Sequence, residues 1–345
     1  MNPDFFSHLQ ADYPRAQLVG CSTAGEIFRD GLLDRSCLLT AIHFDHTTVR
    51  VVDADIGDMD ASRHTGEALG QALAGDDLAG VLMFGIGLQI NGSDLIEGVV
   101  SRIGSDVPIS GGLAGDGSAF QRTWVLSGSG ISDRKVVAVG LYGNRIRLGH
   151  GSFGGWEPFG PYRKITRAEG NILFELDGES ALDIYRRYLG DHARDLPASG
   201  LLFPLEILNE HHSTLGLIRT ILGIDASTGS LILAGSIETN GYLRLMHATT
   251  RALIHGAQLA ADTSMTQLGQ KASTGQGLAL LVSCVGRKLV MGDQTDDEIM
   301  AVVNRVGPGF VYAGFYSYGE ICPMEGFRTC KLHNQTMTVT LLTET

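Results

Sequence analysis

GCSTAGEI (residues 20–27) and GFYSYGEI (residues 314–321) are two short runs of small residues that end in the same way. Aligned without gaps, they share the first glycine, a hydroxyl residue in the fourth place and a final Gly-Glu-Ile. A repeat at both ends of one chain predicts two related halves, or two loops that face one site. Each octet follows an apolar stretch, so a carboxylate is expected at the end of a buried strand in both halves, Glu26 and Glu320.

The bulk composition indicates a globular, acidic protein. The chain has 345 residues, which is too long for one ordinary core and predicts two domains, and 43% of its residues are hydrophobic. A net charge of -12 without a basic stripe disfavours nucleic-acid binding. No signal peptide or membrane-spanning run is recognised, and five cysteines without a CxxC pair suit a reducing compartment, so we expect a cytoplasmic protein.

Apolar runs of strand length alternate with amphipathic runs of helix length, which predicts mixed α/β domains. We expect two internally similar α/β domains with mixed sheets, one over residues 1–153 and one over residues 166–345. The segment GGWEPFGPYRKI (residues 154–165), with two prolines and three aromatic residues, is expected to cross between them as an irregular segment. Three further expectations are a strand at residues 37–44, a hairpin of residues 123–132 with 135–143, and one buried strand at residues 278–291.

Several separated motifs resemble one family. They are GCSTAGEI, GGLAGDG (residues 111–117), GGWEPFG (residues 154–160), NILFELDG (residues 171–178), YSYGEI (residues 316–321) and LHNQTMTV (residues 332–339). This pattern, which covers about residues 15–342, resembles the FIST family of cytoplasmic sensory modules with an N-terminal and a C-terminal α/β domain. Members normally begin with an extra strand before the first helix, whereas this sequence starts at the helix, so either the start is truncated or that strand is absent from the N-terminal sheet.

The longer run GGWEPFGPYRKITR, with NILFELDGESALDIYRRYLG and LPASGLLFPL, is similar to NosP, the haem-binding and nitric-oxide-sensing branch of the family. The resemblance implies haem b as cofactor and nitric oxide as the signal. It also implies a separate partner, either a sensor histidine kinase or a cyclic-di-GMP synthase or phosphodiesterase.

Haem iron needs an axial imidazole, thiolate or thioether inside an apolar wall. His150, in GHGSFGGW, is the first candidate for the iron ligand, with Phe153, Trp156 and Phe159 as the wall of the porphyrin site. An ordinary buried or exposed role is the general prior for any single histidine. Other candidates for the ligand are His333, Cys322 of a Cys-Pro dipeptide, and two histidines that flank the start of a long helix, while two further histidines in a polar turn are expected to be solvated: His247 and His255, and His211 and His212.

The octets and the GGLAGDG loop suggest a second ligand site. Glu26, Asp116 and Glu320, with Tyr318 beside the last of them, would suit a small amine or guanidine, and the family resemblance implies amino acids as a ligand class. The alternative reading is that Gly-Glu is turn chemistry and that each carboxylate caps a helix or pairs with a lysine. A binding module of this kind, without haem, is the alternative function.

No catalytic motif is recognised, so we do not expect an enzyme. Cys21 and Ser22 could act as nucleophiles, but the sequence ties no base to them. Exposed strand edges on an acidic protein favour a homodimer.

Overall fold

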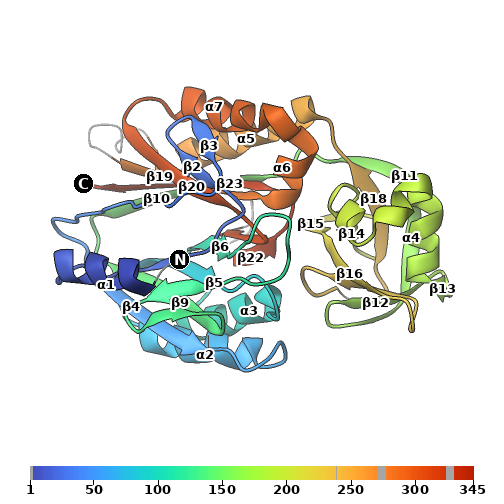
Figure 1. Cartoon of the computed structure of the whole chain (residues 1–345), viewed down its shortest axis with the longest axis horizontal. Coiled ribbons are helices and arrows are strands. Elements are labelled where there is room, and N and C mark those ends of the chain that lie inside the picture. Colours follow the sequence, from blue (N-terminus) through green and yellow to red (C-terminus); the bar gives the residue numbers. More distant parts are fainter. Residues whose placement is uncertain (1–2, 238, 270–276, 324–329) are drawn as a thin grey trace.

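The computed structural model describes residues 3–237, 239–269, 277–323 and 330–345. The chain forms a body that contains two six-stranded sheets, and a lobe built around an eight-stranded sheet (Figure 1). The mixed α/β fold predicted from the sequence is confirmed.

The first sheet of the body, sheet 1, has one parallel pair of neighbours, β5 and β6, and its other neighbours are antiparallel. The run LAGVLMFG of β5 is buried on both faces, as expected for a central strand. In spatial order the strands of sheet 1 are β22 (Cys330–His333), β21 (Gly319–Pro323), β6 (Ile109–Leu113), β5 (Leu78–Gly85), β9 (Lys135–Tyr142) and β4 (Thr48–Asp55).

The second sheet of the body, sheet 2, repeats this layout around the parallel pair β19 and β20. In the order that corresponds to sheet 1, its strands are β3 (Gly31–Leu33), β2 (Glu26–Phe28), β20 (Phe310–Ser317), β19 (Gly277–Cys284), β23 (Met337–Glu344) and β10 (Ile146–Phe153). The two related halves predicted from the repeated octet therefore exist as two sheets of equal topology.

The two hairpins at the ends of these orders are exchanged between the halves. The β2–β3 hairpin comes from the N-terminal octet but pairs with β20, whereas the β21–β22 hairpin follows the C-terminal octet but pairs with β6. The last residue of each octet is fully buried in the other half: Ile27 lies in the core of sheet 2 and Ile321 in the core of sheet 1. At each octet, therefore, the chain of one half adds a strand to the sheet of the other half.

Helices cover the outer faces of both sheets. Figure 1 shows α5 and α7 on one side of the body and α2 and α3 on the other. The helix α3 shows clear start and stop signals, since the Asn91 side chain accepts hydrogen bonds from two backbone amides of the first turn and Gly104 ends the helix at a φ of 86°. The helices are α1 (Pro3–Asp12), α2 (Ser62–Leu73), α3 (Gly92–Ile103), α4 (Ala181–Leu189), α5 (Thr250–Leu268), α6 (Val285–Met291) and α7 (Thr295–Val306).

An apolar layer joins the two sheets. Leu82 and Leu141 of sheet 1 and Leu278 and Leu342 of sheet 2 belong to one buried cluster. A short three-stranded sheet lies at the edge of the body and consists of β1 (Gly20–Cys21), β7 (Val125–Ser127) and β8 (Gly130–Ser132). The body is thus four layers, with helices outside and sheets inside.

The lobe is inserted between β10 and α5. Its core contains Ile165, Tyr185 and Leu245, and α4 packs on its sheet together with the 3-10 helices η1 (Gly190–Asp195) and η2 (Ala198–Leu201). The spatial order of its strands is β15 (Thr214–Arg219), β14 (Leu205–Leu208), β18 (Tyr242–His247), β11 (Glu157–Glu169), β12 (Ile172–Leu176), β17 (Ser230–Leu233) and β16 (Ile221–Asp225), with β13 (Glu179–Ser180) beside β12.

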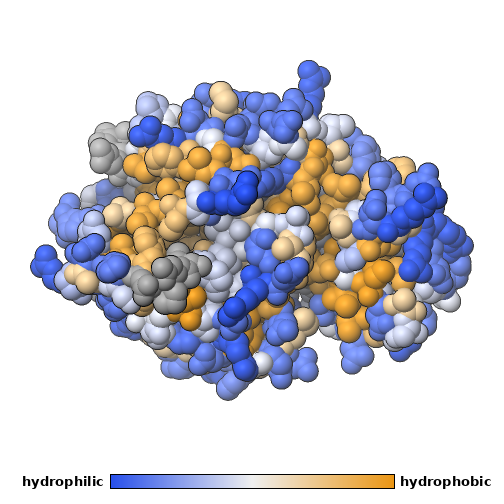
Figure 2. All heavy atoms as spheres, viewed as in Figure 1, coloured by the Kyte–Doolittle hydropathy of each residue, from blue (hydrophilic) through white to orange (hydrophobic). Residues whose placement is uncertain are grey.

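Buried contacts dock the lobe onto the body. The Trp156 indole donates to the carbonyl of Gln335 at 2.8 Å, and the buried Arg219 guanidinium donates to the carbonyl of Leu332 at 3.2 Å. Figure 2 shows apolar side chains gathered where the lobe joins the body, and Trp156 and Leu253 belong to the buried cluster there. These buried contacts join the lobe to the body.

Four sequence expectations need correction or refinement. Residues 37–44 form no strand, because Leu38 and Phe44 pack against the layer between the sheets without joining a ladder. Residues 123–132 form a hairpin on their own, β7–β8, and β9 pairs with β4 and β5 instead.

The strand predicted for residues 278–291 ends at Cys284, whose sulfur accepts a hydrogen bond from Gly286 N, and α6 follows. The segment 154–165 is not irregular throughout, since β11 begins at Glu157. The domain limits 1–153 and 166–345 stay a prediction, since both sheets of the body contain strands from either side of that segment. Over the described part of the chain, no helix combines the length and hydropathy that a membrane crossing requires.

The contact between α2 and α3 depends on glycine. A Cβ on Gly66 would lie 2.1 Å from the carbonyl oxygen of Leu95, so Gly66→Ala forces the two helices apart. We expect a loss of about 1–3 kcal/mol in the free energy of unfolding, measured by urea denaturation. The control Gly128→Ala, where a Cβ meets nothing within 4 Å, should stay within about 0.5 kcal/mol of the wild type. Equal effects of the two changes would contradict the packing argument.

Candidate functional site

The N-terminal octet is closed by a hydrogen bond within the octet. The Thr23 hydroxyl donates to one carboxylate oxygen of Glu26 at 2.7 Å, and the Ser36 hydroxyl donates to the other at 2.6 Å. Gly25 adopts a φ of 135°, which turns the chain from β1 toward β2.

The C-terminal octet has the same bond. The Ser317 hydroxyl donates to Glu320 at 2.7 Å, and the amide and hydroxyl of Thr336 donate to its other oxygen at 3.1 and 2.9 Å. The Glu320 side chain is fully buried, and burial raises its pKa to about 8. Both octets thus contain the same hydrogen bond, from the hydroxyl in the fourth place to the glutamate three residues later.

Backbone hydrogen bonds bring the octets together. Ala24 N donates to Tyr316 O and Tyr316 N donates to Gly25 O, both at 2.8 Å, and Gly115 N donates to Ser22 O at 2.9 Å. Both octets and the GGLAGDG loop therefore meet at the carboxyl ends of the parallel strands, where α/β proteins commonly bind ligands.

Asp116 stabilises its own loop. Its carboxylate accepts hydrogen bonds from the backbone amides of Phe120, Gln121 and Arg122 at 2.8–2.9 Å and from the Tyr318 hydroxyl. Burial opposes ionisation, but these hydrogen bonds outweigh it and lower the pKa of Asp116. The Tyr318 ring stacks on Phe120 with centroids 4.3 Å apart.

Glu26, Asp116, Tyr318 and Glu320 all belong to these three loops, which backbone hydrogen bonds bring together. Each carboxylate already accepts hydrogen bonds from neighbouring hydroxyl or amide groups. This arrangement favours the turn reading of the octets over a site for an amine.

The nucleophile hypothesis gains no support at the same place. Burial, and then the nearby Glu26, raise the pKa of the Cys21 thiol to about 12. The Ser22 hydroxyl accepts a hydrogen bond from Trp124 N at 3.1 Å. Neither group is activated as a nucleophile would need to be.

His150 lies between the two sheets of the body. It is 5% exposed, its Nδ1 is 2.9 Å from the Ser110 hydroxyl, and its Nε2 is buried without a hydrogen-bond partner among the described residues. Burial lowers its pKa to about 4, so the imidazole is neutral at neutral pH. The ring has the right charge state for an iron ligand but is packed inside a sheet interface.

The aromatic residues expected to surround His150 have other surroundings. Trp156 packs with Met246 and Leu253 at the docking seam, Phe153 is 39% exposed, and Phe159 lies in the lobe. These residues do not form a wall on His150, so the residues at this position do not fit a porphyrin.

Two of the other proposed iron ligands, His333 and Cys322, are also occupied or inert. His333 Nε2 is 3.0 Å from the Cys322 carbonyl, and burial lowers the pKa of His333 to about 4. Burial raises the pKa of the Cys322 thiol well above its usual range, which disfavours the thiolate that iron would need.

A cavity of about 380 Å³ lies at the base of the lobe, lined by Phe159, Phe203 and His247. The Phe159 and His247 rings meet edge to face with centroids 6.0 Å apart, and His192 lies 5.4 Å from Phe203. Among the described residues, no hydrogen bond or ion pair engages the His247 imidazole. Two phenyl rings and one imidazole therefore line the same opening.

The three lining residues come from separate elements. Phe159 lies near the start of β11, Phe203 lies between η2 and β14, and His247 is the last residue of β18. The sequence marks His247 as a candidate beside the long helix, whereas Phe203, in the quoted LPASGLLFPL run, has no signal of its own. The cavity is thus next to the two chain crossings, which are the segments that connect the body and the lobe, residues 154–156 and 248–249.

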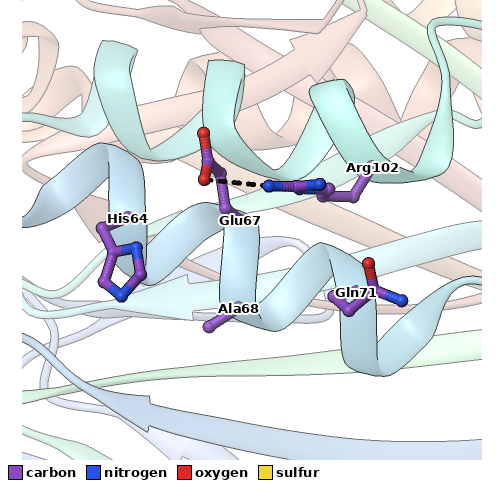
Figure 3. A pocket seen from close by; sticks show the side chains of 5 residues that line it. All are labelled: His64, Glu67, Ala68, Gln71 and Arg102. Atoms are coloured by element: carbon purple, nitrogen blue, oxygen red, sulfur yellow. Dashed lines mark hydrogen bonds and ion pairs between the residues drawn. The ribbon is translucent and has the colours of Figure 1, made fainter.

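A second, smaller depression of about 220 Å³ lies on the outer face of α2 and α3. Figure 3 shows Glu67 directed toward Arg102, and these two side chains form an ion pair at 3.1 Å, with His64 and Gln71 at the rim. A half-exposed ion pair of this kind is ordinary surface chemistry.

Comparison with protein families identifies the architecture. Residues 2–179 match the FIST N domain and residues 181–323 match the FIST C domain. The chain belongs to the FIST family. FIST domains are sensory ligand-binding modules, so the chain is a sensory protein of that kind.

Other similarities are more distant. An uncharacterized protein of Methanocaldococcus jannaschii is 23% identical over 226 residues, which cover 60% of this FIST chain and 40% of that protein, so this chain matches less than half the length of its relative. A crystal structure of a cyanuric acid hydrolase from A. caulinodans aligns with 86% of this chain and 99% of its own at 10% identity and a TM-score of 0.19, which supports no argument.

Glu320 predicts a pH dependence of stability. Because its pKa in the folded protein, about 8, lies above the usual 4.5, the folded protein holds a proton that the unfolded chain releases in this range. Its contribution to stability is therefore complete below about pH 4.5 and falls as the pH rises toward 8, by at most about 1.4 kcal/mol per pH unit. Glu320→Gln should flatten this slope in urea titrations, whereas Glu26→Gln should keep it. An unchanged slope in Glu320→Gln would contradict the assignment.

Proposed function

We propose that this FIST protein is a cytoplasmic haem-based sensor of nitric oxide and not an enzyme, with haem b in the cavity at the base of the lobe. The observation that supports the proposal best is the His247 imidazole, which has no hydrogen-bond partner among the described residues and lines a cavity together with Phe159 and Phe203. An imidazole beside two phenyl rings matches the ligation of haem iron. The haem ligand predicted at His150 thus moves to His247, because His150 is enclosed between two sheets.

The exposure of the lining residues fits a ligand that enters from solution. Phe159 is 43% exposed, and Phe203 and His247 are partly buried. The phenyl rings can pack on the faces of a flat macrocycle, and burying their exposed area supplies apolar binding energy of about 25 cal/mol per Å². The ring of Phe203 also contacts the imidazole of His192, with centroids 5.4 Å apart.

Haem bound in this cavity supplies an iron that binds nitric oxide. His247 ends β18, and the chain continues through the crossing into α5, whose N-cap is Thr249. Any shift of the His247 side chain therefore acts on a strand end that is two residues from the N-cap of a body helix. The response is a change in how the lobe sits on the body.

A separate protein would read this change. The family resemblance suggests a sensor histidine kinase or a cyclic-di-GMP synthase or phosphodiesterase, and a homodimer remains part of the proposal. The alternative, an amino-acid-binding module without haem, is less well supported, because Glu26, Asp116 and Glu320 are engaged in the turns that they close.

The decisive measurement is the visible absorption spectrum of the protein mixed with hemin, reduced and then exposed to nitric oxide. We expect a sharp Soret band that shifts with nitric oxide in the wild type. His247→Ala should lose or alter the band and weaken haem binding by at least about tenfold, because the iron loses its axial ligand.

Two controls complete the experiment. His150→Ala should keep the wild-type spectrum, and Phe203→Ala should weaken haem binding while the ligation signature persists. A normal spectrum in His247→Ala would refute His247 as the ligand. Free-hemin absorption in the wild type would refute the haem proposal itself, and isothermal titration with amino acids would then test the alternative.

A further inference from the structure

The two chain crossings between body and lobe are bound by one buried side chain. Arg287, on α6, donates to the carbonyl of Gly154, at the crossing into the lobe, and to the carbonyl of Leu253 at 2.9 Å, in the first turn after the return. Arg287 is fully buried. A guanidinium has enough donors in a fixed plane to hold both carbonyls at once.

Glu298 on α7 fixes the position of Arg287. Its Oε2 accepts from Arg287 Nε at 3.0 Å and from Arg287 Nη2 at 2.6 Å, and both side chains have zero exposure. A buried pair is weak evidence for added stability, because desolvation offsets most of the attraction. Its geometric effect is clearer, since neither charge can leave the other without a large penalty.

The second oxygen of Glu298 connects this pair to the octets. Its Oε1 accepts from the Tyr316 hydroxyl at 2.6 Å and from the Ser283 hydroxyl at 2.9 Å. Tyr316 belongs to the C-terminal octet, and its backbone bonds to Ala24 and Gly25 of the N-terminal octet. Burial, and then Glu298, raise the pKa of Tyr316 well above its usual range, so the phenol stays a donor.

We infer that the Arg287–Glu298 pair is a positioning element that couples the cavity at the base of the lobe to the octets of the body. The contacts run from the crossings through Arg287, Glu298 and Tyr316 to the turn at Ala24, without a solvent-exposed member among the side chains. The inference rests on the proposed function for what fills the cavity, but the contacts themselves do not depend on that ligand.

The first test uses the full chain without haem. Arg287→Lys keeps the charge but cannot hold two carbonyls and a carboxylate together, so backbone amides near residues 154–157 and 250–254 should exchange hydrogen roughly tenfold faster. The matched control is Arg244→Lys, because Arg244 binds Glu206 at the same 2.6 Å but lies within the lobe sheet. Wild-type exchange at both crossings in Arg287→Lys would overturn the inference.

The second test measures the coupling, and also serves if Arg287→Lys fails to fold. Tyr316→Phe removes one hydroxyl and keeps the ring. Adding hemin to the wild type should change amide exchange at residues 23–28, and Tyr316→Phe should lose this response by at least about fivefold while binding hemin normally. An equal response in Tyr316→Phe would overturn the coupling. Absence of hemin binding by the wild type would instead refute the proposed function and leave the first test to decide.

Discussion

The exchange of the two octet hairpins is the constraint on which the rest of the body depends. Neither sheet closes with strands of its own half, because β2 pairs with β20 and β21 pairs with β6. The shared ending has a role in this exchange. The glutamate accepts the hydroxyl of its own octet, the isoleucine fills the core of the other half, and in the N-terminal octet Gly25 turns the chain at a φ of 135°. The repeat therefore has a structural role in the fold. Its two carboxylates, Glu26 and Glu320, already accept hydrogen bonds from neighbouring hydroxyl groups of the protein.

Local signals made much of the fold predictable. The amphipathic runs of helix length correspond to the helices α2, α3, α5 and α7. The octet repeat indicated two related halves, which the two sheets confirm. The failures have a common cause, since apolarity reports burial and not hydrogen bonding. In residues 37–44, Leu38 and Phe44 pack against the layer between the sheets outside any strand, whereas Leu39 and Ile42 are exposed. Residues 285–291 form a short helix with Val285 and Met291 buried. Strand pairing across distant segments leaves no trace in a single sequence.

The same limit explains the candidate site. The sequence identifies histidines and aromatic rings, but it cannot say that His247 meets Phe159 and Phe203 while His150 faces Ser110. Sequence spacing placed Phe153, Trp156 and Phe159 together, whereas the strand β11 carries Phe159 away into the lobe. Arg287 and Glu298 left no signal either, because charged residues in helical patterns are expected to face solvent, and only the tertiary fold buries them.

Two of the places where the halves of the body differ are in contact with each other. The lobe stands between β10 and α5, where the first half has only the short connection of residues 56–61 between β4 and α2. The helix α6 stands between β19 and α7, where the first half has a loop, residues 86–91. Arg287 belongs to α6 and binds the carbonyls on both sides of the lobe, so the second departure from symmetry holds the first in place. A symmetric body offers no preferred end at which a signal could enter. The paired insertion of lobe and α6 breaks that equivalence, and the cavity beside His247 lies at the point where the break occurs.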